Sequence, residues 1–192
     1  MDSGIRLSSR SRTQPSEKQR DKETTINKQT AFKMTDPNSV RKTINVQAPQ
    51  AVAWRVFTEQ MGMWWPLAVY KIGKTSAVDA IIEPQVGGRW YQRGDDGSTC
   101  DWGSVLSWEP YSRLVLSWDI NADWQYDPDL KTEIEVRFIA QGNDATRVEL
   151  EHRKLDRYGA LRDEMRRIFD TEGDWGRLLS AFAARAVAAY AA

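Results

Sequence analysis

The residues of this sequence that could bind or transform another molecule are mainly aromatic. The chain contains nine tryptophans in 192 residues, more than core packing usually needs. Aromatic side chains that also carry a polar atom suit a pocket for a flat or apolar ligand. Two interpretations remain open, a tryptophan-rich core or a ligand cavity. The candidate ligand-binding residues are Trp54, Trp65, Trp90, Tyr91, Trp102, Trp118, Trp175 and Phe182.

Catalysis by histidine would have one candidate. His152 is the only histidine, and the alternating pattern of residues 146–152 places it on the same face of a strand as Val148 and Leu150. An inward histidine could act as a general base, with Arg89 or Asp101 completing a polar cluster. The alternative is a histidine that is only hydrogen-bonded in place. Whether the protein is an enzyme stays open.

A second polar feature is a pair of arginines. Arg89 and Arg93 flank Tyr91 on one face of a predicted strand. If that face looks inward, the guanidinium groups could hold a ligand carboxylate or phosphate through paired hydrogen bonds. If it looks outward, they are ordinary solvated charges, and the sequence leaves both options open.

Several classes of protein are disfavoured by composition. Lys plus Arg equals Asp plus Glu at 27 each, and the pI is about 6.6, which argues against nucleic acid or an anionic membrane as the main partner. A single cysteine, Cys100, excludes a disulfide framework and a cysteine-based zinc site, and favours a reducing, cytoplasmic location. The sequence contains no phosphate-binding glycine loop, serine nucleophile motif or run of about 18 apolar residues. We therefore expect no metal, no cofactor and no membrane span.

The chain is predicted to divide near residue 38. Residues 1–33 hold eight Lys or Arg, four Asp or Glu and no tryptophan, too little apolar surface to offset the entropy of ordering. We expect residues 1–38 to be a disordered or poorly ordered extension and residues 39–192 to form one domain.

Within that domain, a period-two pattern predicts a run of strands. One strand is expected at 40–47, and about six more lie between 76 and 152, joined by hairpin-length turns such as Asp95-Asp96-Gly97. Successive short turns imply an antiparallel meander. Simple alternation would put Cys100, Trp102, Ser104 and Leu106 on one face. Gly87, Gly88 and Gly103 are the points at which the sheet could bend.

The first predicted helix follows the first strand. Pro49 suits the first turn of a helix, since its missing N–H costs nothing there. A short helix further on holds Trp64 and Trp65 and ends at Pro66. Two adjacent tryptophans on such a helix cannot both point inward, so we expect one of them at a rim or on the surface.

A long helix is predicted from Thr171 to about Tyr190. Thr171 could serve as the N-cap, with Asp174 three residues on. An apolar stripe recurs at helical spacing, and such a stripe must be buried. The fold class is therefore α+β, with a curved antiparallel sheet that wraps this helix and leaves an apolar cavity beside it. The stripe consists of Trp175, Leu178, Leu179, Phe182, Ala183, Ala186, Val187 and Tyr190.

Five segments together resemble a known family. APQAVAW (48–54), WWP (64–66), EPQVGGRWYQ (83–92), WGSVLSWEPYSRLVLSW (102–118) and GDWGRLLSAF (173–182) are similar to the branch of the START-like (SRPBCC) superfamily named after the activator of heat-shock-protein ATPase. The resemblance covers about residues 40–192. It implies a helix-grip fold over an internal cavity, but not one activity. Members of the superfamily bind lipids, steroids or polyketides, a few are cyclases, and the eukaryotic namesake binds a chaperone.

Three functions follow as hypotheses. The first is binding of a hydrophobic or aromatic small molecule in the cavity. The second is an enzyme of cyclase or hydrolase type that uses the same cavity through His152 with Arg89 or Asp101. The third is a chaperone-associated module that binds protein through an exposed apolar patch around Trp64, Trp65 and Trp124.

Overall fold

A seven-stranded antiparallel sheet dominates the computed structural model, which describes residues 36–192 apart from the side chains of residues 172 and 173. The spatial order is β1-β7-β6-β5-β4-β3-β2, so strands β2 to β7 form a meander and β1 pairs with β7. The predicted antiparallel meander is confirmed. The extension predicted for residues 1–38 falls, up to residue 35, outside the described residues. The strands are β1 (Val40–Val46), β2 (Ala77–Ile82), β3 (Arg89–Gly94), β4 (Thr99–Glu109), β5 (Arg113–Trp118), β6 (Thr132–Ala140) and β7 (Thr146–Arg153).

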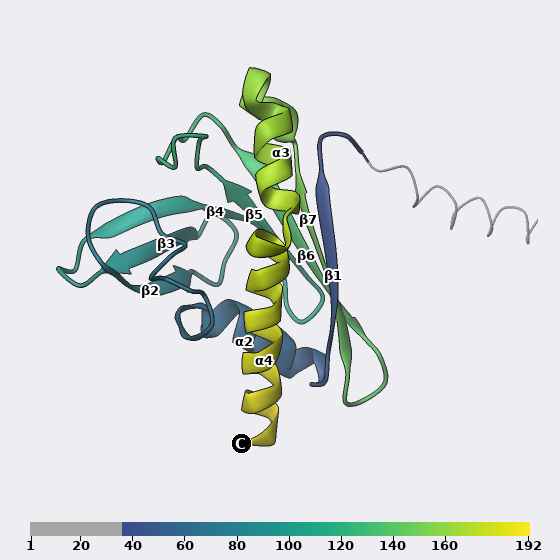
Figure 1. Cartoon of the computed structure of the whole chain (residues 1–192). Helices are drawn as coiled ribbons and strands as arrows, with labels where there is room; N and C mark the ends of the chain where they lie inside the picture. Colours follow the sequence, from purple (N-terminus) through teal and green to yellow (C-terminus); the bar gives the residue numbers. More distant parts are fainter. Residues whose placement is uncertain (1–35) are drawn as a thin grey trace, which may run out of the picture. The chain divides into compact units, whose positions relative to one another are not determined.

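The helices lie at the two ends of this strand run. α2 (Gln50–Glu59) and the short η2 (Met61–Met63) follow β1, whereas η3 (Leu155–Leu161), α3 (Arg162–Asp170), the π-helical η4 (Glu172–Gly176) and α4 (Arg177–Ala191) follow β7. Figure 1 shows the sheet curled around α4, with α2 crossing that helix. The predicted α+β helix-grip fold is confirmed. No helix among residues 36–192 is both long and apolar enough to cross a membrane.

The C-terminal helix begins later than predicted. Residue Asp174 has non-helical backbone angles (φ −110°, ψ −110°), so η4 separates α3 from a regular α4 that starts at Arg177. The Thr171 hydroxyl donates to the Ile168 carbonyl at 2.9 Å, which closes α3, and it does not cap α4. The predicted cap is therefore wrong, and Asp174 is left at a break between two helices.

The buried stripe of α4 is shorter than predicted. Its inward residues are Leu178, Leu179, Phe182 and Ala186. Val187 and Tyr190 are instead exposed, at 40% and 45%, and the Tyr190 hydroxyl donates to Asp144 in the turn between β6 and β7.

Irregularities in β4 overturn the simple alternation predicted for that strand. Trp90 pairs with Gly103 and Tyr91 with Asp101, which leaves Trp102 as an extra residue in β4. A second shift lies between Val105 and Ser107. Each bulge reverses the parity of the residues beyond it. Trp102 and Val105 consequently both point into the core, and Leu106 is 43% exposed.

Both members of the Trp64-Trp65 pair are buried, at 6% and 5% exposure, contrary to the expectation that one would lie at the surface. They follow the short η2 and do not share a helical turn, so the chain can direct both inward. The Trp64 indole N–H donates to the Val56 carbonyl of α2, and that of Trp65 donates to the Tyr70 carbonyl. The patch predicted around Trp64, Trp65 and Trp124 therefore has one exposed member, Trp124 at 44%.

The Gly103 bulge gives a prediction for stability. A Cβ at Gly103 would lie 2.0 Å from the Ser117 carbonyl oxygen of β5, so β4 and β5 would have to separate. We expect Gly103→Ala to lower the free energy of unfolding by at least about 2 kcal/mol, measured by chemical denaturation. Gly176→Ala is the matched control, since its added Cβ meets no described atom within 4 Å apart from its chain neighbours and its own helix backbone, and its φ of −62° is helical. The bulge would not require glycine if Gly103→Ala were as stable as the unsubstituted protein.

Candidate ligand-binding cavity

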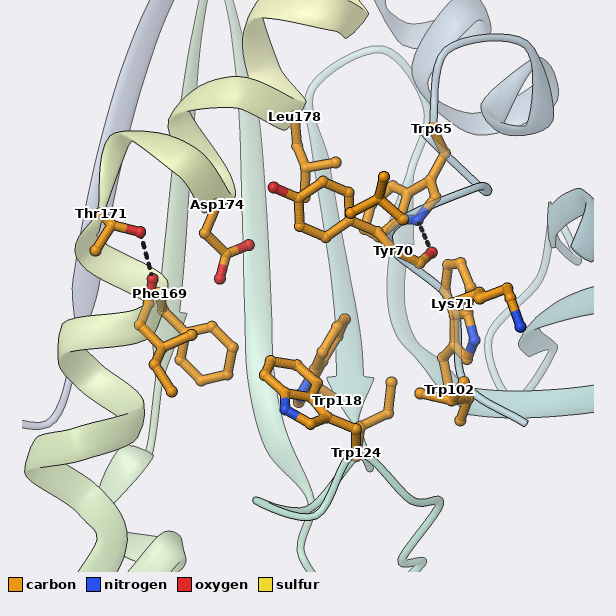
Figure 2. Close-up of a pocket in the computed structure, with 14 residues that line it drawn as sticks. Trp65, Tyr70, Lys71, Trp102, Trp118, Trp124, Phe169, Thr171, Asp174 and Leu178 are labelled. Carbon is orange, nitrogen blue, oxygen red and sulfur yellow. Dashed lines mark hydrogen bonds between the residues drawn. The ribbon is translucent and has the colours of Figure 1, made fainter. Parts of the chain in front are cut away.

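A cavity of about 560 Å³ lies between the sheet and the break that separates α3 from α4. Its walls come from the segment that follows η2, from β4 and β5, from the loop after β5, and from the break between α3 and α4 (Figure 2). Most of the lining is apolar or aromatic, as is usual for small-molecule pockets. The lining residues are Trp65, Val69, Tyr70, Lys71, Ile72, Trp102, Trp118, Ile120, Trp124, Ile168, Phe169, Thr171, Asp174 and Leu178.

One wall is held in place by a buried glutamine. The Gln92 side chain of β3 accepts hydrogen bonds from the Ile72 backbone N–H at 2.9 Å and from Trp102 Nε1 at 3.1 Å, and it donates to the Ile72 carbonyl at 2.7 Å. A buried amide of this kind is costly unless its groups are paired. Gln92 therefore ties the loop at Ile72 to Trp102 of the bulge, and both residues face the cavity.

The aromatic rings of the walls contact one another. Trp65 and Trp102 have ring centroids 5.1 Å apart, and Trp65 is also held by its hydrogen bond to Tyr70. On the opposite side, Phe169 lies 6.1 Å from Trp118 and 6.4 Å from Trp124 in edge-to-face geometry. These contacts and hydrogen bonds give the cavity a preformed shape.

Asp174 brings a carboxyl group to this apolar surface. Figure 2 shows its side chain directed from the helix break toward the space between Phe169, Leu178 and Trp118. Among the described groups, none donates a hydrogen bond to this carboxylate, and Lys42 is the charge that acts on it. Burial raises the pKa of Asp174 to about 7, since the charged form loses hydration.

The other charged side chain among the described lining residues is Lys71. Its ammonium group points to backbone carbonyls, at 3.0 Å from Thr75 O and 3.5 Å from Gly73 O. Lys42 is likewise engaged, with the carbonyl of Asp170 at 2.7 Å and its carboxylate at 2.9 Å. Neither ammonium group forms an ion pair with Asp174, so within residues 36–192 this carboxylate has no described ion-pair partner.

His152 lies in the core beneath the cavity, with both ring nitrogens engaged. Trp175 Nε1 donates to His152 Nδ1 at 3.3 Å, and Nε2 lies 2.9 Å from the Thr132 hydroxyl, which itself donates to the Trp118 carbonyl. This chain of hydrogen bonds requires the neutral tautomer with the proton on Nε2. Complete burial lowers the pKa of His152 to about 3, so the ring is neutral at physiological pH.

The three candidate catalytic residues are not brought together. Arg89 and Asp101 form an ion pair of 2.6 Å on the outer face of the sheet, where the Arg89 guanidinium also stacks over the Tyr91 ring. Trp90 and Gln92, between these positions, point into the core. Arg89, Tyr91 and Arg93 therefore face outward, and His152 lies on the other side of the sheet.

The eight candidate ligand-binding residues divide into three groups. Trp65, Trp102 and Trp118 line the cavity. Trp54, Trp90, Trp175 and Phe182 are buried in the core, and Tyr91 lies on the outer face. The other eleven lining residues, among them Tyr70, Trp124, Phe169, Asp174 and Leu178, were not candidates for ligand binding. For Asp174 the available signal was an acidic residue directly before Trp175 in GDWG, which the sequence assigns to a helix cap.

A sheet curled around a C-terminal helix, with a cavity beside it, defines a protein of the helix-grip class. Residues 47–186 match the family model for "Activator of Hsp90 ATPase homolog 1-like protein". The chain belongs to this family, which confirms the resemblance found in the sequence. No curated protein sequence matches the chain.

Solved structures agree with this assignment. The chain is similar to an anthrahydroquino-γ-pyrone synthase, Txn09, complexed with SUM, at 36% identity over 76% of this chain and 95% of that one, with a TM-score of 0.55. It is also similar to CalC, a self-sacrificing resistance protein from Micromonospora echinospora, at 28% identity over 79% and 96%, with a TM-score of 0.58. A protein from Nitrosomonas europaea shares the fold at 14% identity over 80% and 96%, with a TM-score of 0.56.

The displaced pKa of Asp174 predicts that this residue opposes folding near neutral pH. The carboxyl has an ordinary pKa of 3.8 in the unfolded chain and about 7 in the folded protein, so the folded state binds the proton more tightly. Stability is then lost as the pH rises from about 4 through 7. We expect Asp174→Asn to raise the free energy of unfolding at pH 8 by on the order of 2 kcal/mol, and the gain to vanish near pH 4.

Thermal and chemical unfolding at the two pH values measure this difference. Asp163→Asn is the matched control, because it removes one carboxylate from exposed surface of α3. A destabilising effect of Asp174→Asn at pH 8 would contradict the assignment of Asp174 as an unpaired, desolvated acid.

The tautomer of His152 can be tested directly, since it is the only histidine. Long-range ¹H–¹⁵N correlation spectra should show a proton on Nε2 and none on Nδ1. We expect these signals to stay unchanged from pH 5 to pH 8, because the pKa is about 3. A titration with a midpoint near 6.5 would show instead a solvated ring able to act as a base.

Proposed function

We propose that the protein binds a small, largely apolar aromatic molecule in the cavity beside α4. The observation that carries this proposal is a partly open cavity of about 560 Å³ whose walls are largely tryptophan and phenylalanine. Small-molecule sites typically measure roughly 300–1,000 Å³ and combine apolar walls with a few polar groups. Rings such as Trp65 and Trp124 offer faces and edges for stacking on a flat ligand.

Preorganisation supports the same conclusion. Trp65 and Trp102 are held by hydrogen bonds to Tyr70 and Gln92, so binding would not have to order them. Avoiding such ordering strengthens binding, because each immobilised side chain otherwise costs free energy. The relatives add to this support: the printed name of the synthase at 36% identity refers to a fused aromatic compound.

An enzyme of cyclase or hydrolase type in the same cavity is the second candidate. The likeness to a synthase favours it, and the carboxyl of Asp174 is the group on the wall that could transfer a proton. In this version His152, Arg89 and Asp101 take no part.

The family name also favours a chaperone or other protein as a partner, although binding would need a surface other than Trp64 and Trp65. A cytoplasmic location, inferred from the single cysteine, belongs to the same proposal.

A fluorescence titration with 1-aminoanthracene, a neutral three-ring fluorophore, tests the binding function. We expect saturable binding with one site per chain. Leu178→Trp should weaken it at least about tenfold by filling the cavity, and Trp124→Ala should weaken it about threefold or more by removing one stacking surface.

The control for the added bulk is Val187→Trp, which places the same side chain on an exposed position of the same helix. Circular dichroism establishes that each variant is folded. The proposal fails if the unsubstituted protein shows no saturable binding, or if folded Leu178→Trp binds as tightly as the control.

A further inference from the structure

The cavity combines an unpaired carboxyl group with aromatic ring faces. Lys71, the other charged residue among its described lining, has its ammonium group on the carbonyls of Gly73 and Thr75. Asp174 receives no hydrogen bond from any described group, and its carboxylate is directed into the cavity (Figure 2). Lys71 keeps its positive charge, but its ammonium group lies away from Asp174 (Figure 2), so Asp174 has no ion-pair partner among the described lining residues.

The rings around this carboxylate add to the attraction for positive charge. Trp118, Trp124 and Phe169 line the same part of the cavity as Asp174, and Trp65 faces them across it. The face of an aromatic ring attracts a cation, and groups of such rings recognise quaternary ammonium ligands. Ammonium groups with alkyl substituents are weakly hydrated, so they lose less on leaving water than a primary ammonium does.

We propose that the ligand of this cavity carries a tertiary or quaternary ammonium group on its apolar aromatic body, bound between the Asp174 carboxylate and the surrounding rings. This inference rests on the proposed small-molecule function and names the chemistry of its ligand. Folding has already removed part of the hydration of the carboxylate, so an incoming cation gains the ion pair at a smaller further cost of desolvation. An anionic ligand would be repelled, and a neutral one would leave the carboxyl group without a charged partner.

The proposal predicts a dependence of affinity on pH. Lys42 of β1 and Tyr158 of η3 act electrostatically with Asp174, and Tyr70 and Lys71 line the same cavity. His152 accepts a hydrogen bond from Trp175, the residue next to Asp174. His152 has a pKa of about 3 and burial raises the pKa of Tyr158 above its usual 10, so neither changes protonation between pH 6 and 8.

The ionised fraction of Asp174 follows from its own pKa. With a pKa of about 7, the ionised fraction rises from about 10% at pH 6 to about 90% at pH 8. Only the ionised form pairs with a cation. Affinity for a cationic ligand should therefore rise about tenfold between pH 6 and 8, whereas affinity for a neutral ligand should not rise.

Two probes of the same shape separate charge from size. One is N,N,N-trimethyl-(2-naphthylmethyl)ammonium, and the other is 2-(2,2-dimethylpropyl)naphthalene, in which carbon replaces the charged nitrogen. Binding of each is measured by quenching of tryptophan fluorescence at pH 6 and pH 8. At pH 8 we expect the cation to bind at least about tenfold more tightly than its neutral analogue, and at pH 6 most of this preference should be lost.

Asp174→Asn should remove both the preference for the cation over the neutral probe and its pH dependence. Asp163→Asn, which removes an exposed carboxylate of α3, should change neither. The unsubstituted protein alone tests the pH dependence, so the result does not depend on the folding of a variant.

The two proposals fail in different ways. If the neutral probe binds and the cation binds no more tightly at pH 8, or if Asp174→Asn keeps the preference, the cationic ligand is excluded and the cavity function stands. If neither naphthalene probe nor 1-aminoanthracene binds, the proposed function itself is wrong, and the inference about its ligand falls with it.

Discussion

The packing of α4 against the inner face of the curled sheet is the constraint on which the rest of the domain depends. Leu178, Leu179, Phe182 and Ala186 are buried there, and each large side chain contributes roughly 1.5–3 kcal/mol of hydrophobic stabilisation. This helix remains regular only from Arg177 onward. At the break before it, the backbone of Asp174 departs from helical angles, and Phe169, Asp174 and Leu178 line the cavity there. The cavity therefore lies between this break and the sheet residues Trp102 and Trp118.

Within residues 36–192, several buried polar side chains around the cavity are hydrogen-bonded, whereas the carboxyl group of Asp174 is not. Gln92, Thr132, His152 and Tyr158 all form hydrogen bonds, and these bonds hold loops and strands together around the cavity. Paired groups of this kind specify one arrangement of a core, because breaking a pair leaves a costly unsatisfied atom. Asp174 differs from these four residues, since its carboxyl group is partly desolvated and accepts no hydrogen bond from a described group. A residue that opposes folding in this way is typical of functional sites, where a bound ligand supplies the partner that the group lacks in the free protein.

Membership of a family does not by itself define the ligand of this chain. The synthase and the resistance protein share the fold and 36% and 28% of aligned residues, yet their printed descriptions name different activities. Function in such a fold depends on the residues that line its cavity, and here those residues come from four separate parts of the chain. The outer face carries a different chemistry, with ion pairs such as Arg89–Asp101 and Arg93–Asp79 exposed to solvent. Pairs of this kind contribute little to stability and define no site.

The sequence by itself determined the fold class, the run of strands, the helical ends and the inward position of His152, because period-two and helical patterns and tight turns are encoded by neighbouring residues. Tertiary structure alone decided which aromatic residues face the cavity. The bulge at Trp102 reverses the parity of β4 through pairing with β3, and Trp64 and Trp65 both turn inward because α2 and a loop accept their indole N–H groups. The sequence likewise assigned Asp174 to a helix cap, whereas the break between α3 and α4 directs it into the cavity. These outcomes depend on contacts between residues distant in sequence, which local patterns do not encode.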